Sequence, residues 1–169
     1  MKKLKENLPF GALDSYSIYT VNSSGGDLKL LVSEPDKWIN SPVWSPDGKM
    51  IAYLTAGKNP PNAKFMNIFT LENGVAKVVG EVPVAGTNID LAWSPDNRQI
   101  AFNDREGKVI KVMNINDGTI EDIQTNLADE ISIFHLDWSP DGKQFVFGGE
   151  KGGLTEFWVM EDFLPLIKK

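Results

Sequence analysis

One short segment recurs three times along the chain, and this recurrence constrains the fold more than any other feature. The copies occupy residues 41–53, 90–102 and 135–147, and each contains Trp-Ser-Pro-Asp followed by a short apolar run. Their tryptophans, Trp44, Trp93 and Trp138, are 49 and 45 residues apart. A nearly constant period of this length predicts a repeating architecture in which each unit has the same local fold.

The residues around each copy predict two strands joined by a tight turn. In Ser45-Pro46-Asp47-Gly48 the proline suits the second position of a type I turn, and the glycine suits a left-handed backbone at the fourth position. Residues 139–142 repeat this pattern, and Asn97 replaces the glycine in the second copy. The aspartate of each turn is therefore expected to cap the turn rather than to belong to a metal or acid–base cluster.

A second hairpin accompanies each complete repeat. Asn73-Gly74 and Asp117-Gly118 are strong hairpin signals between short apolar strands, and Gly25-Gly26 marks a similar turn nearer the N-terminus. The predicted strands fall into groups of two, four, four and three, and no stretch has sustained helical periodicity.

The sequence thus predicts an all-β fold of the β-propeller type. Its blades would each contain four antiparallel strands, with about three to three and a half blades in the chain. Residues 1–169 would form a single domain, with repeats at about 17–40 (partial), 41–87, 88–132 and 133–163 (partial).

The composition removes most kinds of catalytic and metal chemistry. The 169 residues include no cysteine and one histidine, His135, which excludes thiolate sites and histidine pairs. The sequence also contains none of the motifs of serine hydrolases, zinc peptidases, P-loop proteins or dinucleotide-binding folds. We therefore expect a protein that is not an enzyme and that uses no metal and no cofactor.

The charge distribution bears on partners and compartment. The formal net charge is −6, and five of the 17 basic residues are lysines close to the two ends, so the body of the chain has no basic stripe for nucleic acid. Glu6-Asn7 interrupt the basic N-terminus where a secretory signal needs an apolar run, so the chain as written predicts no export signal and no membrane span. Both a cytoplasmic location and, after removal of a signal, a periplasmic one stay open.

In these residues the chain resembles the WD-repeat-like blades of the TolB-type β-propellers, whose blade signature is an apolar residue followed by Trp-Ser-Pro-Asp-Gly-Lys-x-Ile-Ala-Phe. The resemblance covers about residues 17–163, with departures at Asn97-Arg98 and at Phe145-Val146. It implies a ring of six or more blades around a central channel, with ligands bound at the channel mouth and on the loops.

Three copies of Trp-Ser-Pro-Asp are fewer than such a ring implies. An open row of blades would expose unpaired strand edges and an apolar face. Three solutions are consistent with the sequence: the chain is a piece of a longer propeller, it closes a small ring of four blades, or two chains form a homodimer that completes one ring.

Five residues are candidates for ligand binding. The resemblance places the residues that lead the first strand of a blade near the channel, and these include Asn88. His135 and Asp137 are also a candidate proton-transfer or ligand pair, although period two puts them more simply on one solvated side of a strand. Because the three repeated tryptophans are expected in the core, only Trp38 and Trp158 are candidates for exposed aromatic stacking, as in sugar binding. The five are Trp38, Asn40, Asp90, His135 and Asp137.

The sequence favours a non-catalytic binding module that presents loops and a channel mouth to a protein or peptide partner. Its acidic balance favours a basic partner or one approached through aromatic and polar loop contacts, and residues 59–61, 104–106 and 151–153 are further surface contributors. Two alternatives remain: the propeller portion of a larger enzyme or sensor that gates substrate or relays a signal, and a module that binds a small molecule or sugar in its channel.

Overall fold

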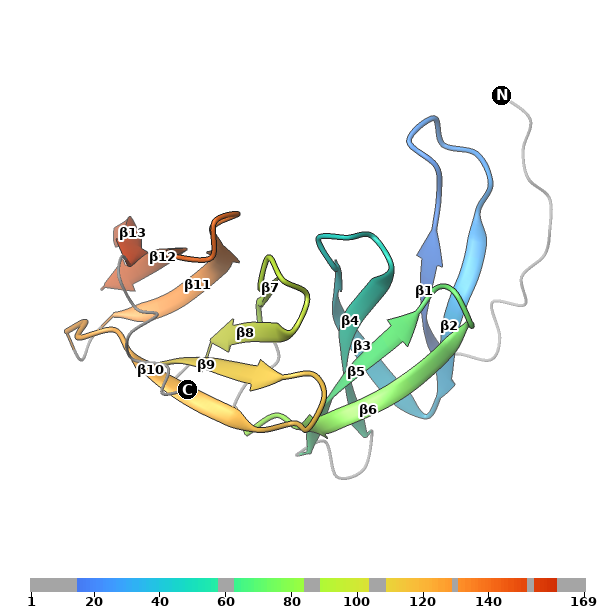
Figure 1. Ribbon diagram of the computed structural model, residues 1–169, viewed down its shortest axis with the longest axis horizontal. Coiled ribbons are helices and arrows are strands. Elements are labelled where there is room, and N and C mark those ends of the chain that lie inside the picture. Colours follow the sequence, from blue (N-terminus) through green and yellow to red (C-terminus); the bar gives the residue numbers. More distant parts are fainter. Residues whose placement is uncertain are drawn as a thin grey trace.

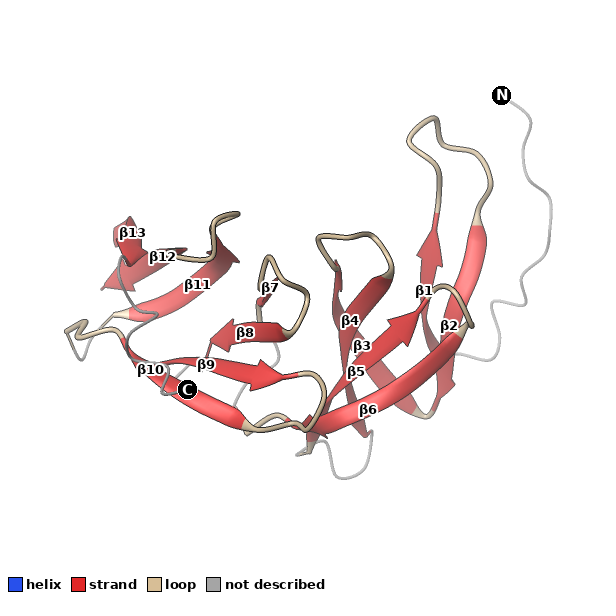
Figure 2. Ribbon diagram, in the orientation of Figure 1, coloured by secondary structure: helices blue, strands red, loops and turns tan. Residues whose placement is uncertain are grey.

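The computed structural model describes residues 15–57, 63–83, 89–103, 109–128, 131–151 and 154–160. These ranges contain strands and no helix, so none of their segments is a helix that could cross a membrane (Figure 2). The strands are β1 (Ser15–Thr20), β2 (Lys29–Pro35), β3 (Lys37–Trp44), β4 (Met50–Gly57), β5 (Lys64–Thr70), β6 (Val75–Glu81), β7 (Leu91–Trp93), β8 (Gln99–Asn103), β9 (Val109–Asn114), β10 (Ile120–Gln124), β11 (Ser132–Trp138), β12 (Phe145–Lys151) and β13 (Leu154–Met160).

The strands form four antiparallel sheets in which each strand pairs with its neighbour in the sequence. The N-terminal sheet holds β1 and β2, the central sheets hold β3–β6 and β7–β10, and the C-terminal sheet holds β11–β13. The predicted groups of two, four, four and three strands are thus confirmed for the described ranges. β3 begins at Lys37, inside the stretch that the repeat pattern assigns to the N-terminal partial unit.

The sheets follow one another along the length of the molecule, and apolar cores lie between them. Figure 1 shows the N-terminal sheet at one end, the C-terminal sheet at the other, and the β3–β4, β7–β8 and β11–β12 turns all on the same side. Each sheet is therefore stabilised by burying apolar area against the next, as in other repeat proteins. From the N-terminal end, the three cores include Ile18, Val32 and Tyr53; Leu54, Met66, Trp93 and Phe102; and Ala101, Ile110, Trp138 and Phe145.

The turn after each repeated tryptophan has the predicted left-handed residue. The φ angles of Gly48, Asn97 and Gly142 are 69°, 61° and 75°. Only glycine, and at some energetic cost asparagine, adopts this conformation readily, which explains the residue choice at all three positions.

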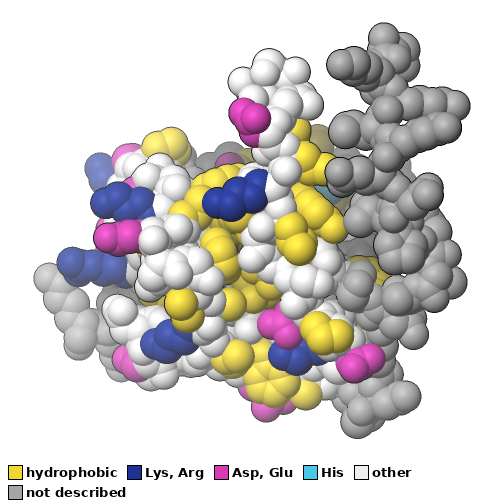
Figure 3. Space-filling model, turned by 90° about the vertical axis from the view of Figure 1, so that its right-hand side faces the viewer, with side chains coloured by type: hydrophobic (Ala, Val, Ile, Leu, Met, Phe, Trp, Pro, Cys, Tyr) yellow, Lys and Arg dark blue, Asp and Glu magenta, His cyan; other side chains and the backbone are white. Residues whose placement is uncertain are grey.

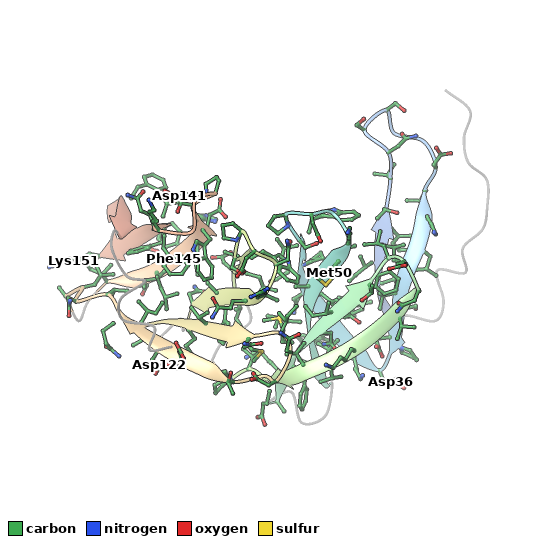
Figure 4. The ribbon with its side chains drawn as sticks, in the orientation of Figure 1. Asp36, Met50, Asp122, Asp141, Phe145 and Lys151 are labelled. Carbon is green, nitrogen blue, oxygen red and sulfur yellow. The ribbon has the colours of Figure 1, made fainter. Side chains whose placement is uncertain are left out.

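The turn aspartates act as caps, which confirms the interpretation made from the sequence. The Asp141 carboxylate accepts hydrogen bonds from the Ser139 hydroxyl at 2.7 Å and from the Lys143 backbone N–H at 3.1 Å, and the same contacts recur in the other two turns. These bonds, the serine bond first, lower the pKa of Asp141 and of Asp47 below the ordinary value. Figure 4 shows Asp141 at the tip of its turn, away from Asp122 on the outer strand β10.

The three repeated tryptophans are not equally buried, so the expectation of three equivalent core positions is wrong for Trp44. Trp93 and Trp138 are 5% and 6% exposed and pack against a four-stranded sheet, whereas Trp44 is 50% exposed. Trp44 lies on the side of its sheet that faces the two-stranded N-terminal sheet. The core on that side contains Ile18 and Val32 from β1 and β2 but not Trp44.

A bulge recurs in the first strand of two sheets. Ser41 in β3 and His135 in β11 each lie three residues before the repeated tryptophan, with φ angles of 54° and 53°. The pairing register shifts at the same two places. Because both sheets share the positive φ, we attribute it to the repeat and not to a function of His135 alone.

Candidate functional site

Two of the five predicted binding residues meet between the β7–β10 sheet and the β11–β13 sheet. Asp90 directly precedes β7, and the bulge of β11 carries His135. The backbone N–H of His135 donates a hydrogen bond of 2.5 Å to Oδ2 of Asp90. The other carboxylate oxygen, Oδ1, accepts no hydrogen bond from any described residue, so part of the carboxylate is available to a ligand.

A buried asparagine fixes this arrangement. Asn103, at the end of β8, is 2% exposed. Its Oδ1 accepts a 3.0 Å hydrogen bond from the Asp90 backbone N–H, and its Nδ2 donates a 2.8 Å bond to the Ile133 carbonyl. Both ends of the amide are thereby satisfied, which a buried polar side chain requires. Asn103 therefore positions Asp90 and ties the two sheets together.

These residues border a cleft with a volume of about 440 Å³, within the range of small-ligand pockets. We call it the acidic cleft. It lies between the end of β8, the Asp90 loop and the strands β11 and β12. Its lining residues are Asp90, Asn103, Ser132, Ile133, Phe134, His135 and Glu150.

One wall of the acidic cleft is aromatic. The Phe134 ring lies directly over Gly148 of β12, and a Cβ atom built on Gly148 would stand 2.5 Å from Cε2 of that ring. The absence of a side chain at Gly148 is thus what admits the ring. Phe134 also makes an edge-on contact with the His135 ring, with the ring centroids 5.1 Å apart.

The acidic cleft carries a negative charge. Asp90 and Glu150 are its two carboxylates, and no lysine or arginine is among its lining residues. Across the described ranges, no three histidine, aspartate or glutamate side chains lie close enough together to hold a metal ion. A cationic group in the cleft would meet the carboxylates and the face or edge of Phe134, and both favour it.

A second cleft, the tryptophan cleft, lies among the turns that follow the repeated tryptophans and has a volume of about 360 Å³. The indole N–H of Trp93 donates a 3.2 Å hydrogen bond to the Val43 carbonyl, and that of Trp138 donates one to the Gly142 carbonyl at 3.2 Å. The lining residues are Val43, Trp44, Pro46, Leu91, Ala92, Trp93, Pro95, Asp137, Trp138 and Pro140.

The structure does not bring the other predicted residues into the acidic cleft. Asp137 is exposed and lines the tryptophan cleft, so it and His135 border different clefts. Trp38 is half-exposed on β3 with its ring 6.1 Å from that of Tyr16, and the half-buried Asn40 lies on the same strand. Asn88, the side chain of Trp158, residues 59–61 and 104–106, and Gly152-Gly153 lie outside what the structure describes.

Sequence reasoning missed five of the seven residues that line the acidic cleft. Asn103, Phe134 and Glu150 belong to no recognised motif. A signal was nevertheless present for one of them, because Asn103 follows Ile100-Ala101-Phe102 at a position where the first repeat has Leu54 and the third has Gly148. A polar residue that replaces an apolar one in a repeat points to a local hydrogen-bond role.

Successive antiparallel sheets packed face to face define the class of the β-propellers. This chain contains part of such an array, and three of its four sheets share the same turn. Residues 7–162 match the family model of the TolB beta propeller domain, and the chain belongs to that family. The family predicted from the blade motif is thereby confirmed.

Individual relatives share the fold over only part of their own length. The chain is similar to TolB from Acinetobacter baumannii, with 24% identity and a TM-score of 0.68 over 86% of this chain and 35% of that one. It is also similar to an oligogalacturonate lyase from Vibrio parahaemolyticus, with 15% identity and a TM-score of 0.65 over 85% of this chain and 41% of the lyase.

A third relative is similar in sequence. It is a subunit of eukaryotic translation initiation factor 3 from Cryptococcus neoformans, 33% identical over 108 residues, a match that covers 56% of this chain and 14% of that protein. The chain thus spans less than half of each of these three relatives.

Proposed function

We propose that this chain is a non-catalytic binding module whose acidic cleft takes a basic segment of a protein partner. The observation that carries the proposal is that two carboxylates, Asp90 and Glu150, line one open cleft together with the Phe134 ring. A lysine or arginine side chain fits this chemistry, because two carboxylates attract its charge and the ring attracts it further.

The net charge of the whole chain also favours a basic partner. Its net charge of −6 attracts positively charged segments over a distance of about 10 Å at ordinary ionic strength. A protein partner is favoured because one relative is a named subunit of a larger assembly. The cleft is also wide enough to hold one long side chain with part of its backbone.

The arrangement of the possible acid–base groups supports a binding role over catalysis. His135 and Asp137 border different clefts, which favours separate roles for the two side chains over the proton-transfer pair considered from the sequence. In the described ranges, the hydroxyl group of each serine in the repeated turns donates a hydrogen bond to the aspartate of its own turn.

A binding experiment with a charge-matched control tests the proposal. The probe is a synthetic peptide with two arginines separated by glycine, compared by calorimetry with the same peptide carrying neutral citrulline. We expect Glu150→Gln to weaken binding of the arginine peptide about tenfold, which corresponds to about 1.4 kcal/mol. Glu121→Gln removes an equal charge from exposed β10, outside the cleft, and should change the affinity by less than about twofold.

The outcomes separate site binding from general attraction. Equal affinity for the arginine and citrulline peptides, or equal losses in the two variants, would contradict the proposed site. Raising the salt concentration should weaken binding of the arginine peptide, because part of its affinity is Coulombic.

A second candidate function is that this chain forms the propeller portion of a larger enzyme. This candidate is favoured because the chain is similar in fold to an oligogalacturonate lyase and covers less than half of it. In this role the cleft would receive an acidic sugar, which two carboxylates disfavour. Binding of an oligogalacturonate in place of the arginine peptide would support this second candidate.

A further inference from the structure

The internal repeat shows what a junction between two sheets requires. At the first junction, Trp93 packs in the same core as Ala52 and donates its indole N–H to the Val43 carbonyl of the preceding sheet. At the second junction, Trp138 packs in the same core as Ala92 and Ala101. Each junction therefore places a tryptophan from the first strand of one sheet against small residues on the first two strands of the sheet before it.

The β3–β6 sheet presents the tryptophan half of such a junction to solvent. Trp44 is 50% exposed, where its equivalents Trp93 and Trp138 are 5% and 6% exposed. Pro42 is also exposed, although its equivalents Leu91 and Leu136 are buried. Within the described ranges, the indole N–H of Trp44 has no hydrogen-bond partner.

Figure 3 views the end of the molecule that carries the N-terminal sheet. Hydrophobic side chains gather in the middle of this face, and charged side chains lie around them. The exposed large hydrophobic residues of β1, β2 and β3 are Tyr16, Tyr19, Leu30, Trp38 and Trp44.

The C-terminal sheet presents the other half of the junction. Val146 of β12 is 41% exposed, where its equivalents Ala52 and Ala101 are fully buried. Phe157 of β13 is 77% exposed. It pairs with Gly148 of β12 in the same way as Met66 of β5 pairs with Leu54 of β4, so it lies on the same face as Val146. At the end of β11, Asp137 occupies the place of Val43 and Ala92, and its carboxylate stays on the open tryptophan cleft.

We propose that a second copy of this chain docks its β11–β12 face, centred on Val146, against Trp44. The contact would repeat the part of the two internal junctions made by the first two strands of the preceding sheet, because β1 and β2 already pack Ile18 and Val32 against this side of the β3–β6 sheet. The backbone carbonyl of the partner subunit's Asp137 would correspond to the Val43 carbonyl that receives the Trp93 indole N–H. Each chain carries both halves at opposite ends, so two copies can form two such contacts and close as a dimer. The acidic cleft borders this surface, because the Phe134 ring lies over Gly148 on the same face of the C-terminal sheet as Val146.

The dimer and the basic-peptide site respond differently to salt. Two chains of net charge −6 repel each other, and their proposed contact is mainly apolar. Added salt screens the repulsion and leaves apolar association intact, so dimerisation should persist or strengthen at 0.5 M sodium chloride, at about 4 Å Debye length. Binding of the arginine peptide should weaken under the same conditions.

Light scattering during size-exclusion chromatography tests the proposal directly. The wild-type chain should elute with twice its 18.7 kDa mass. Val146→Lys should raise the dimer dissociation constant at least tenfold, because the ammonium group would be buried in the contact. Val78→Lys is the matched control, since Val78 is a similarly exposed valine on the outer strand β6 and should leave the dimer intact.

Cross-linking locates the surface while keeping Trp44 in place. The chain has no cysteine, so Pro42→Cys and Val146→Cys chains can be prepared separately and mixed with a short bismaleimide. We expect cross-linked pairs in the mixture and far fewer between Pro42→Cys and Val78→Cys chains. A wild-type mass of one chain at every concentration, masses that grow beyond two chains, or a dimer unaffected by Val146→Lys would overturn the proposal. Peptide binding measured on the same samples at low and high salt distinguishes the two sites, because only peptide binding should weaken as salt is added.

Discussion

The Phe134 ring covers Gly148 so closely that a methyl group on that glycine would overlap the ring, at 2.5 Å from Cε2. The aromatic wall of the acidic cleft thus depends on a glycine in the neighbouring strand. A substitution at Gly148 can therefore change the shape of the cleft without changing its charge, because Gly148 itself does not line the cleft.

Gly148→Ala is expected to displace the Phe134 ring and to weaken binding of the arginine peptide several-fold. The charges of Asp90 and Glu150 stay in place, so the selectivity against the citrulline peptide should fall less than the affinity does. Overpacking of this kind costs about 1–3 kcal/mol of stability, and circular dichroism should show an unchanged sheet content. Undiminished affinity in a folded variant would show that Phe134 makes no contact with the peptide.

Gly118→Ala should destabilise the chain by about 2 kcal/mol or more. Gly118 has a φ of 74°, and an added Cβ would lie 2.7 Å from the carbonyl oxygen of Val79 in the neighbouring sheet. Gly74→Ala is the matched control, because Gly74 has a φ of 66° with no atom within 4 Å of the added Cβ. The control should lose only about 1 kcal/mol from backbone strain in urea unfolding. Equal losses would show that the contact with Val79 is relieved without cost.

The sheets and turns were predictable because their causes are local. The Ser45 hydroxyl bonds to Asp47 two residues later and receives the Met50 N–H five residues later, so a short stretch of sequence specifies the whole turn. The acidic cleft depends instead on how two sheets pack. The contact between His135 and Asp90 spans 45 residues, and no pattern within either repeat indicates it.

The exposure of Trp44 shows the same limit of sequence reasoning. Trp44 and Trp93 stand in nearly identical segments, yet one is half-exposed and the other is buried. Their local strands and turns agree, and the difference comes from the sheet on the other side. Repeats predict what each unit is, whereas burial at the ends of the array depends on what covers them.

Asp141→Asn is expected to make the chain less sensitive to acid. Hydrogen bonds from Ser139 and from the Lys143 backbone hold the pKa of Asp141 below its ordinary value. The unfolded chain therefore binds a proton at higher pH than the folded chain does. This contribution to stability is present above the ordinary aspartate pKa of about 4 and is lost as the pH falls through the lower folded value.

Urea unfolding between pH 6 and pH 2 measures this effect. The decline in the midpoint should be smaller in Asp141→Asn than in the wild type, because asparagine keeps an acceptor oxygen but does not titrate. Glu121→Gln removes an exposed carboxylate that accepts no hydrogen bond from the described residues, and it serves as the control. If the two variants and the wild type lose stability in parallel, the turn bond does not contribute to acid sensitivity.

Tyr53→Phe should preserve stability at neutral pH or raise it by about 1 kcal/mol. Tyr53 is fully buried in the core beside the N-terminal sheet, and its hydroxyl has no hydrogen-bond partner in the described structure. Burial, with a further contribution from the Glu34 carboxylate, raises the pKa of Tyr53 to about 12. Between pH 10 and that value the unfolded tyrosine ionises while the folded one stays neutral, so the wild type should lose stability as the pH rises.

Thermal unfolding of the wild type and Tyr53→Phe at pH 7 and pH 11 checks both parts of this expectation. The variant should lose less stability than the wild type between the two pH values, since phenylalanine cannot ionise. Tyr19→Phe is the control, because Tyr19 is 48% exposed and its replacement should change stability at pH 7 by less than about 0.5 kcal/mol. A Tyr53→Phe variant that is clearly destabilised at pH 7 would show that the hydroxyl has a partner, such as a buried water, which contributes to the core.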